Sequence, residues 1–401
     1  MSEIFTGNFT QQDPIPDDAI EAAMSVLQSG RLHRYNVAEG ELSQAALLEQ
    51  EFATAMGARF ALAVSSGGYA IATALRAVGV KPGDRVLTNA FTLAPVPGAI
   101  ASLGAEPVFV EVTEALTIDL EDLAAKIAQG SDIKVLLLSH MRGHICDMDH
   151  LMHICDAAGV IVVEDCAHTM GARWNGTLSG RHGAMAAYST QTYKHMNSGE
   201  GGLLISNDPD LMARAIMLSG SYMLYERHLA GPPAEAFEKV KYVTPNISGR
   251  MDNLRAAILR PQLARLDRQC AAWNVRYAEI EQGLANTPGL TVIARPKAED
   301  YVMSSFQFLL LDWSDKDVNK VLTRCGARGV ELKWFGGAEP TGFTSRYDSW
   351  RYADTPDMPK TNRILRGVLD VRLPLTFSVE DCAQIARIIR EEVSVVYQSA
   401  L

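Results

Sequence analysis

One lysine and two carboxylates follow strand candidates in the middle of the chain. The β-branched run 160–163 ends on Glu164 and Asp165, and a second strand candidate, residues 184–189, leads to Lys194. A continuous apolar run of this kind is typical of a strand that is buried on both faces. Because the carboxyl ends of parallel strands meet at one edge of an open α/β sheet, we expect Asp165 and Lys194 to share a crevice there.

This pair of side chains indicates a carbonyl cofactor. A lysine amine forms Schiff bases with carbonyl groups, and pyridoxal phosphate (PLP) is commonly held in this way. The protonated pyridine ring of PLP is the electron sink and needs an acidic partner, a role that Asp165 fits. Taken singly, Lys194 would be a solvated surface lysine and Asp165 a turn or strand-end residue. Only the combination favours a cofactor site.

A second motif suits the phosphate of such a cofactor. Residues 60–64 predict a short buried strand, Ser65-Ser66-Gly67-Gly68 a small-residue turn, and residues 69–78 a helix. The backbone N–H groups and the dipole of a helix N-terminus both favour an anion. The turn is not GxGxxG, and no acidic residue stands where a dinucleotide ribose would need one. A plain turn is the alternative interpretation.

Composition limits the class of protein. The chain has 401 residues, 47% hydrophobic and 21% charged, which predicts a large domain plus a smaller one. The net charge of −10 argues against a nucleic-acid-binding surface. The polar N-terminus resembles no signal peptide, and no stretch reaches the ~20 apolar residues of a membrane span, so we expect a cytoplasmic protein. The six cysteines are scattered without a CxxC motif, so we expect reduced thiols and no metal site.

The predicted elements alternate. Helices are expected within 16–57, at 120–128 and near Ala99, and strands at 85–87, 106–112 and 135–139. This alternation predicts a mostly parallel sheet with helices on both faces. From about residue 270 the pattern changes to a long helix, a strand at 305–311, and helices at 317–324 and 379–396. We therefore expect a large domain over 1–268, a smaller α+β domain over 269–401 on which the N-terminal tail packs, and a surface loop at 347–359.

Several motifs in one order resemble the PLP-dependent sugar and cyclitol aminotransferases of the DegT/StrS type. They are SGRLHRYN (29–36), AVSSGGYAIATAL (63–75), GAEPVFVEV (104–112), SHMRGHICDMD (139–149), VVEDCAHTMGARW (162–174), SxxxxKxxxxGEGG (189–202) and SGRMDNLRAAILRPQLARLD (248–267). The AHxxGARW form most resembles the branch that acts on cyclitols or forms aminohydroxybenzoate. The resemblance implies the type I aminotransferase fold, with a mostly parallel seven-stranded sheet flanked by helices, and covers nearly the whole chain.

The resemblance also implies roles. Lys194 would form the Schiff base and then shuttle a proton, Asp165 would pair with the pyridine nitrogen, and His168 would lie beside the cofactor ring. Ser189 and the backbone at Ser66, Gly67 and Gly68 would bind the phosphate. The segment around Ser248 would cross from the other subunit, which implies a homodimer with shared active sites.

The chain departs from the family pattern at several positions. Gly68 replaces the usual threonine, and Ser248 the usual asparagine. The ring-stacking aromatic aligns with Leu93, although Phe91 is two residues away. Arg372 stands in the segment that is usually SLPL. Because a guanidinium fork matches a carboxylate bidentately, Arg34, Arg142 or Arg372 is expected to hold one, unless these are surface or salt-bridge residues. The further substrate-binding candidates are polar or aromatic residues in the same motifs: Tyr35, His140, Arg250 and Trp334.

The resemblance therefore implies an aminotransferase. By a ping-pong mechanism, it would move an amino group from glutamate or glutamine to a ketone of a sugar, cyclitol or related polyol. The retained Lys194 argues against the family dehydratases in which this lysine is replaced. A dehydrating, aromatising enzyme of the aminohydroxybenzoate synthase kind stays open, as does a regulatory protein that binds PLP or a sugar without turnover.

Overall fold

A seven-stranded sheet forms the centre of the molecule. The computed structural model describes residues 3–130 and 132–400. In spatial order the strands are β1 (Phe60–Val64), β9 (Gly202–Ser206), β8 (Met185–Ser189), β5 (Ile161–Asp165), β4 (Val135–Ser139), β2 (Arg85–Asn89) and β3 (Glu106–Val110). Only β9 runs antiparallel to its neighbours in this sheet, and the other pairings are parallel. The expected α/β class with a mostly parallel central sheet is confirmed.

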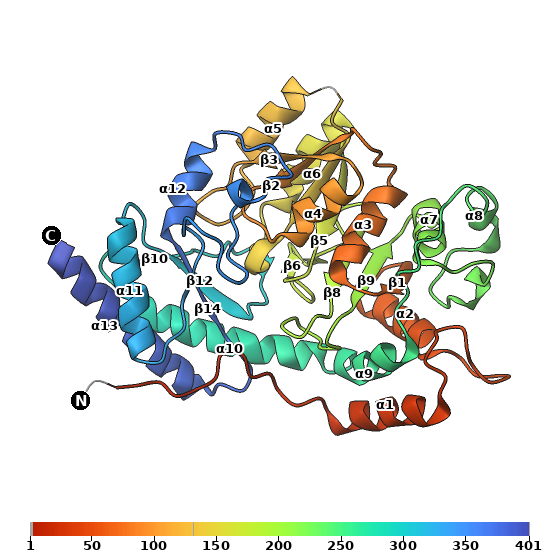
Figure 1. The fold of residues 1–401 in the computed structure, drawn as a ribbon, viewed down its shortest axis with the longest axis horizontal. Helices are drawn as coiled ribbons and strands as arrows, with labels where there is room; N and C mark the ends of the chain where they lie inside the picture. Colours follow the sequence, from red (N-terminus) through yellow and green to blue (C-terminus); the bar gives the residue numbers. More distant parts are fainter. Residues whose placement is uncertain (1–2, 131, 401) are drawn as a thin grey trace.

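Helices cover both faces of this sheet (Figure 1). Successive strand residues point to opposite faces, so neighbours such as Val86 and Leu87 belong to different hydrophobic clusters. One cluster contains residues of α3 (Gly67–Ala77), α4 (Pro95–Ser102) and α7 (Pro209–Ser219). The other contains residues of α2 (Gln44–Ala55), α5 (Leu120–Gln129) and α6 (Met148–Ala158). Burial on both faces explains why the strands are apolar throughout.

The C-terminal part of the chain carries a second sheet. Its four antiparallel strands lie in the order β10 (Thr291–Val292), β12 (Ser305–Leu309), β14 (Val368–Arg372) and β13 (Lys333–Trp334). The helices of this part are α10 (Leu266–Leu284), α11 (Asp315–Ala327), α12 (Pro359–Gly367) and α13 (Val379–Ala400). A third small sheet joins β11 (Glu299–Asp300), β6 (Arg173–Trp174) and β7 (Thr177–Leu178).

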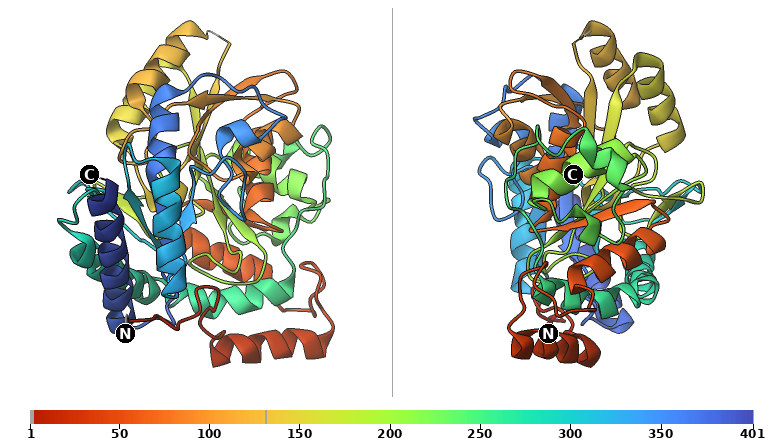
Figure 2. Two further views of the ribbon diagram at one scale, coloured as in Figure 1. Left: turned by 60° about the vertical axis from the view of Figure 1, so that its left-hand side comes forward. Right: turned by 90° about the vertical axis from the view of Figure 1, so that its right-hand side faces the viewer.

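The N-terminal residues pack on this C-terminal part. The Phe5 N–H donates to the carbonyl of Arg328 at 2.8 Å. The rings of Phe5, Phe9 and Phe377 contact one another edge to face. Helix α1 (Asp17–Ser29) then lies along the outer rim of the molecule beside α9 (Asn253–Leu263), as both views of Figure 2 show. No helix of the described residues is long and apolar enough to cross a membrane.

The expected surface loop at 347–359 is wrong in one respect. The segment begins with a 3-10 turn, Tyr347–Ser349, and two of its aromatic side chains are buried: Tyr347 is 2% exposed and Trp350 is 6% exposed. Both rings contact Phe109 on the edge strand β3. A composition rich in Tyr, Asp and Pro predicts turns. It does not show that two of the aromatic rings pack against a phenylalanine of a strand far away in the sequence.

Candidate active site

A pocket of about 430 Å³ lies where the C-terminal ends of the central strands face the second sheet. Loops that follow the central strands supply Leu93, Arg142, His168 and Lys194, and the second sheet supplies Ser305 and Arg372. The volume falls within the usual range for small-molecule sites. The remaining lining residues are Ser66, Gly67, Gly68, Ala94, Pro95, Ser189, Gln191, Tyr193, Glu200, Ser304, Gly342, Phe343 and Ser345.

Lys194 lies in the turn after β8 and reaches the floor of this pocket. Its Nζ atom is 2.7 Å from Nε2 of His168. Burial of the amine, opposed by Asp165 and aided by Arg142 and Arg372, lowers its pKa from 10.5 to about 7. An amine with this pKa is largely neutral under mildly basic conditions, so it is a competent nucleophile.

Asp165 is the last residue of β5 and lies behind the pocket wall. Its Oδ2 accepts from Ser139 Oγ at 3.0 Å, and its Oδ1 accepts from the Ala167 N–H at 3.1 Å. Burial raises the pKa of this carboxyl, although the two donors and Lys194 act in the opposite direction. The carboxyl is therefore oriented by its neighbours and is poised to gain a cationic partner.

The turn between β1 and α3 forms an anion cradle. Ser66 is the N-cap of α3, and its Oγ accepts from the Tyr69 N–H at 3.0 Å. The first N–H groups of a helix have no partner within the helix, so those of Gly67 and Gly68 can point to a ligand. A Cβ on Gly67 would lie 2.8 Å from the Cβ of Ser189, so the cradle and the end of β8 meet closely.

His168 joins the lysine to the arginine loop. Its Nδ1 accepts from the Arg142 N–H at 3.3 Å. Burial, with Lys194 and Arg142 nearby, lowers the pKa of the imidazole well below its usual value. A neutral ring that accepts at Nδ1 carries its proton on Nε2, the atom that faces Lys194.

Of the two candidates for the ring-covering residue, the structure places Leu93 in the pocket. Phe91 is buried elsewhere, edge to face with Phe335 at 5.0 Å between ring centroids. The expectation that Phe91 could cover the cofactor ring is therefore corrected. Only Thr92 stands between the two residues, in the bend after β2. Phe91 is buried inside an apolar cluster, whereas Leu93 packs against the edge of that cluster and also lines the pocket.

Arg34 and Tyr35 lie away from the pocket, which corrects their expected place beside a substrate. Both nitrogens of the Arg34 fork donate to Glu49, at 2.8 and 2.9 Å, and the pair is fully buried. His228 contacts both this pair and the hydroxyl of Tyr35. Because Glu49 is on α2 and also accepts from the Ala63 N–H, this network ties α2 to strand β1.

His140, Arg250 and Trp334 also lie outside the lining of the pocket. His140 is buried against Glu164 at 3.0 Å; Glu164 in turn accepts from three N–H groups of the 180–183 turn. Arg250 donates to the Gly220 carbonyl, and Trp334 Nε1 to the Arg366 carbonyl. The expected substrate contacts of His140 and Trp334 are therefore corrected to contacts within the chain. Arg250 belongs to the segment that is expected to cross between subunits, so its substrate contact stays a prediction.

Ser248 is exposed on the surface segment that precedes α9. Its neighbour Gly249 accepts at its carbonyl from the Ser65 N–H at 2.8 Å, just before the anion cradle. Within one chain Ser248 does not line the pocket, and its expected cross-subunit contact stays a prediction.

Sequence reasoning missed several residues that line the pocket, among them Tyr193, Glu200, Ser305 and Phe343. Tyr193 directly precedes Lys194 in the sequence, and this adjacency could have marked it as a pocket residue. Ser305 and Phe343 come from segments more than 100 positions after Lys194, and no local pattern marks them as pocket residues.

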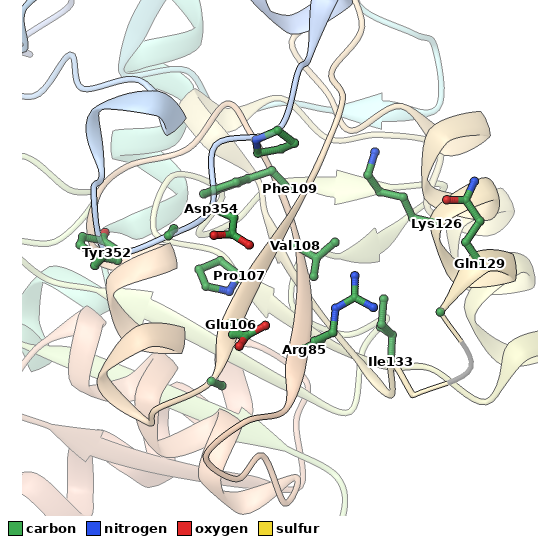
Figure 3. A pocket seen from close by; sticks show the side chains of 14 residues that line it. Arg85, Glu106, Pro107, Val108, Phe109, Lys126, Gln129, Ile133, Tyr352 and Asp354 are labelled. Carbon is green, nitrogen blue, oxygen red and sulfur yellow. The ribbon is translucent and has the colours of Figure 1, made fainter.

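A second cavity, of about 570 Å³, lies beside the edge strand β3 (Figure 3). Arg85, Glu106, Lys126 and Asp354 line it, from β2, β3, α5 and the 352–356 segment. Lys126 is already paired with Asp122, and Arg85 with Asp132. This cavity shares no residue with the Lys194 pocket. Because the lysine and the anion cradle both line the Lys194 pocket, we take that pocket as the candidate active site.

Comparisons with known proteins show which proteins this chain is similar to. The DegT/DnrJ/EryC1/StrS aminotransferase family matches residues 15–390. The 3-amino-5-hydroxybenzoate synthase of Amycolatopsis mediterranei is 36% identical over 249 residues, 60% of each chain. A pleiotropic regulatory protein of Geobacillus stearothermophilus is 34% identical over 224 residues, 55% of this chain and 56% of that protein. The matches thus span less than two thirds of these curated relatives.

Among solved structures, a 3-amino-5-hydroxybenzoic acid synthase is similar along its whole length. The TM-score is 0.81 at 26% identity, and the alignment covers 97% of this chain and 99% of that one.

Proposed function

The chain belongs to the DegT/DnrJ/EryC1/StrS aminotransferase family, and from that premise we propose that it is a PLP-dependent aminotransferase. It would move an amino group from glutamate or glutamine to a ketone of a sugar, cyclitol or related polyol by a ping-pong mechanism. The observation that carries this proposal is the partly buried amine of Lys194, whose pKa is lowered to about 7. It shares its pocket with an anion cradle and has Asp165 behind the wall.

The residues present fit PLP on chemical grounds. The cradle of Gly67 and Gly68 at the α3 N-terminus, with Ser189 beside it, suits a phosphate. Asp165 suits the ring nitrogen, because a cation there would compensate the buried carboxylate. Leu93 offers an apolar surface to a ring. When bound, PLP supplies an electron sink for the transfer of the amino group.

The side chains of the protein would supply the rest. Lys194 would hold the cofactor through Nζ and, once released, carry a proton on that atom, for which a pKa near 7 is favourable. His168 would hold Lys194 in position through Nε2, because its own ring is fixed by the Arg142 N–H. Asp165, as a carboxylate, would pair with the ring nitrogen of the cofactor and keep that nitrogen protonated.

We also propose a homodimer with shared active sites, in which Ser248 lies near the partner's phosphate cradle. Large apolar side chains are exposed near this segment: Tyr242 is 81% exposed and Val243 is 78% exposed. Ile20, Met24 and Leu27 are exposed on one side of α1. Exposed large apolar side chains that lie close together in the sequence support an interface at these two segments. The cytoplasmic location and the division into 1–268 and 269–401 remain parts of this proposal.

The visible spectrum of the purified protein tests the function. A yellow band on addition of PLP, which bleaches with glutamate or glutamine, is the expected result. A band that no amino donor bleaches would contradict the aminotransferase and favour the dehydrating or regulatory alternatives. If no yellow band appears with added PLP, the proposal that the protein binds PLP is contradicted.

A further inference from the structure

Three cationic side chains gather on the wall of the pocket that faces Lys194. Arg142 and Arg372 line the pocket, and Lys333 lies beside them on β13. The buried carboxylate of this group is Asp370 on β14, whose Oδ2 is 3.2 Å from Nη2 of Arg142. Three cations thus share one buried carboxylate. A further carboxylate, Glu200 in the lining, is exposed to solvent, so the cations still outnumber the carboxylates in this partly desolvated place.

The two guanidinium groups are held in fixed positions. Arg142 lies over the Phe335 ring, 5.6 Å from its centroid, and its ion pair with Asp370 anchors it from behind. Arg372 stacks on Tyr193, with its guanidinium carbon 3.8 Å from the ring centroid. Stacking uses the flat face of a guanidinium, so the N–H groups at its edge stay available for a ligand.

The protein leaves some donor atoms of this group without hydrogen-bond partners. Among the residues that the structure describes, Arg142 Nε and Lys333 Nζ are buried without a hydrogen-bond partner. Burial, opposed by Asp370 and aided by Arg142 and Arg372, lowers the pKa of Lys333 to about 8. Burial, together with Arg142, also lowers the pKa of Arg372. Uncompensated buried cations cost free energy, which an anion in the pocket would recover.

We propose that Arg372 and Arg142 bind a carboxylate of the substrate, and that Arg372 is a specificity-determining residue of the pocket. This inference rests on the proposed function, because it places the carboxylate opposite the amine of Lys194. Arg372 would supply the bidentate fork and Arg142 the anchored second donor. A planar carboxylate matches such a fork better than a hydroxyl-rich neutral ring does.

Calorimetric titration with two probes of equal shape tests the proposal. Glutarate carries two carboxylates, whereas glutaramide is its uncharged diamide. We expect wild-type protein to bind glutarate, Arg372→Gln to bind it at least tenfold more weakly, and Arg372→Lys to fall between them. Glutaramide should bind weakly to all three. Equal glutarate affinity in wild type and Arg372→Gln would overturn the proposal.

Arg363→Gln is the matched control. Arg363 is an exposed arginine of α12 paired with Asp312 and Glu114, away from the pocket. Its loss should leave glutarate affinity within about twofold of wild type. A control as weak as Arg372→Gln would mean that overall charge governs binding, and it would also overturn the proposal.

The two possible sources of the carboxylate are separated by half-reactions. If Arg372→Gln slows the loss of the yellow PLP band on addition of glutamate, the carboxylate belongs to the amino donor. If it slows amination of a carboxylated cyclic ketone and spares an uncharged one, the carboxylate belongs to the acceptor. Either result supports the proposal, and no effect on both would contradict it.

Failure of this inference and failure of the proposed function give different results. The titrations can be made with cofactor-free and PLP-loaded protein, so they do not depend on turnover. If the protein takes up PLP and responds to glutamate, but Arg372→Gln binds glutarate as wild type does, the proposed function stands and this inference is overturned. A protein without a PLP band loses the function, and its glutarate affinity still tests Arg372.

Discussion

The Nε2 atom of His168 lies 2.7 Å from Nζ of Lys194, and the other nitrogen of that imidazole accepts the Arg142 N–H. Because Nδ1 accepts from the Arg142 backbone N–H, the neutral ring carries its proton on Nε2 and donates a hydrogen bond to the lone pair of a neutral Lys194 amine. The lowered pKa values of both groups agree with that state. The histidine therefore holds the amine of Lys194 in its neutral form, and the amine can attack a carbonyl once its lone pair leaves this hydrogen bond.

Lys194→Ala should abolish covalent attachment of PLP. The alanine variant has no amine in the pocket, so borohydride treatment followed by mass spectrometry should find no cofactor fixed to the protein, and turnover should be lost. Far-UV circular dichroism should match wild type. Lys239→Ala is the control, because Lys239 is exposed and paired with Asp210. Normal activity in Lys194→Ala would refute the assignment of this lysine.

The rate of PLP uptake should follow the pKa of Lys194. Because burial lowers this pKa to about 7, the neutral fraction should rise about tenfold per pH unit below 7 and level off above it. Stopped-flow absorbance between about pH 5.5 and about pH 9 measures this profile. Lysines with the usual pKa would still gain reactivity up to about pH 10. A profile that keeps rising past pH 9 would contradict the lowered pKa.

Asp165→Asn should retain some cofactor and lose most of the rate, on the order of 10²-fold or more, because an amide cannot hold the ring nitrogen protonated. Burial raises the pKa of Asp165, so the charged form is disfavoured in the cofactor-free fold. Removal of that charge should therefore leave the cofactor-free protein at least as stable near neutral pH. Thermal unfolding and steady-state kinetics test both parts, and unchanged kinetics would exclude this role.

Gly67→Ala should damage the anion cradle, whereas Gly68→Ala should not. A Cβ on Gly67 would lie 2.8 Å from the Ser189 Cβ, but one on Gly68 meets only the Pro95 Cβ at 3.7 Å. We expect a loss of about 1–3 kcal/mol of unfolding free energy for Gly67→Ala. Its PLP affinity should also fall. Chemical denaturation and PLP titration compare the two variants, and equal behaviour would disprove the close approach.

Arg34→Met should destabilise the fold rather than change substrate affinity. The substitution leaves the buried carboxylate of Glu49 without its guanidinium, which costs about 3–5 kcal/mol. Arg34 also lowers the pKa of Glu49, which stands at about 2, so the pair contributes stability that is lost as the pH falls toward that value. Denaturation at neutral pH checks the expected loss. A stable variant with weakened substrate binding would instead restore the substrate role.

Local pattern predicted much of this protein. The apolar runs at 160–163 and 135–139 predicted buried strands, and the structure has β5 and β4 there, within two residues. The turn from Ser65 to Gly68 leads into α3 as expected. Asp165 and Lys194 could be placed at one sheet edge because parallel strands end on the same side.

The tertiary structure decided which side chains face the pocket. Arg34 and Arg372 are equally cationic in the sequence, yet Arg34 is neutralised by Glu49 fifteen positions away, and Arg372 enters the pocket at the end of β14. Phe91 and Leu93 both contact the apolar cluster around Phe335, but only Leu93, at its edge, lines the pocket. These outcomes depend on contacts between distant segments. Composition and spacing determine elements, whereas the partners available after folding determine whether a charge is satisfied or left for a ligand.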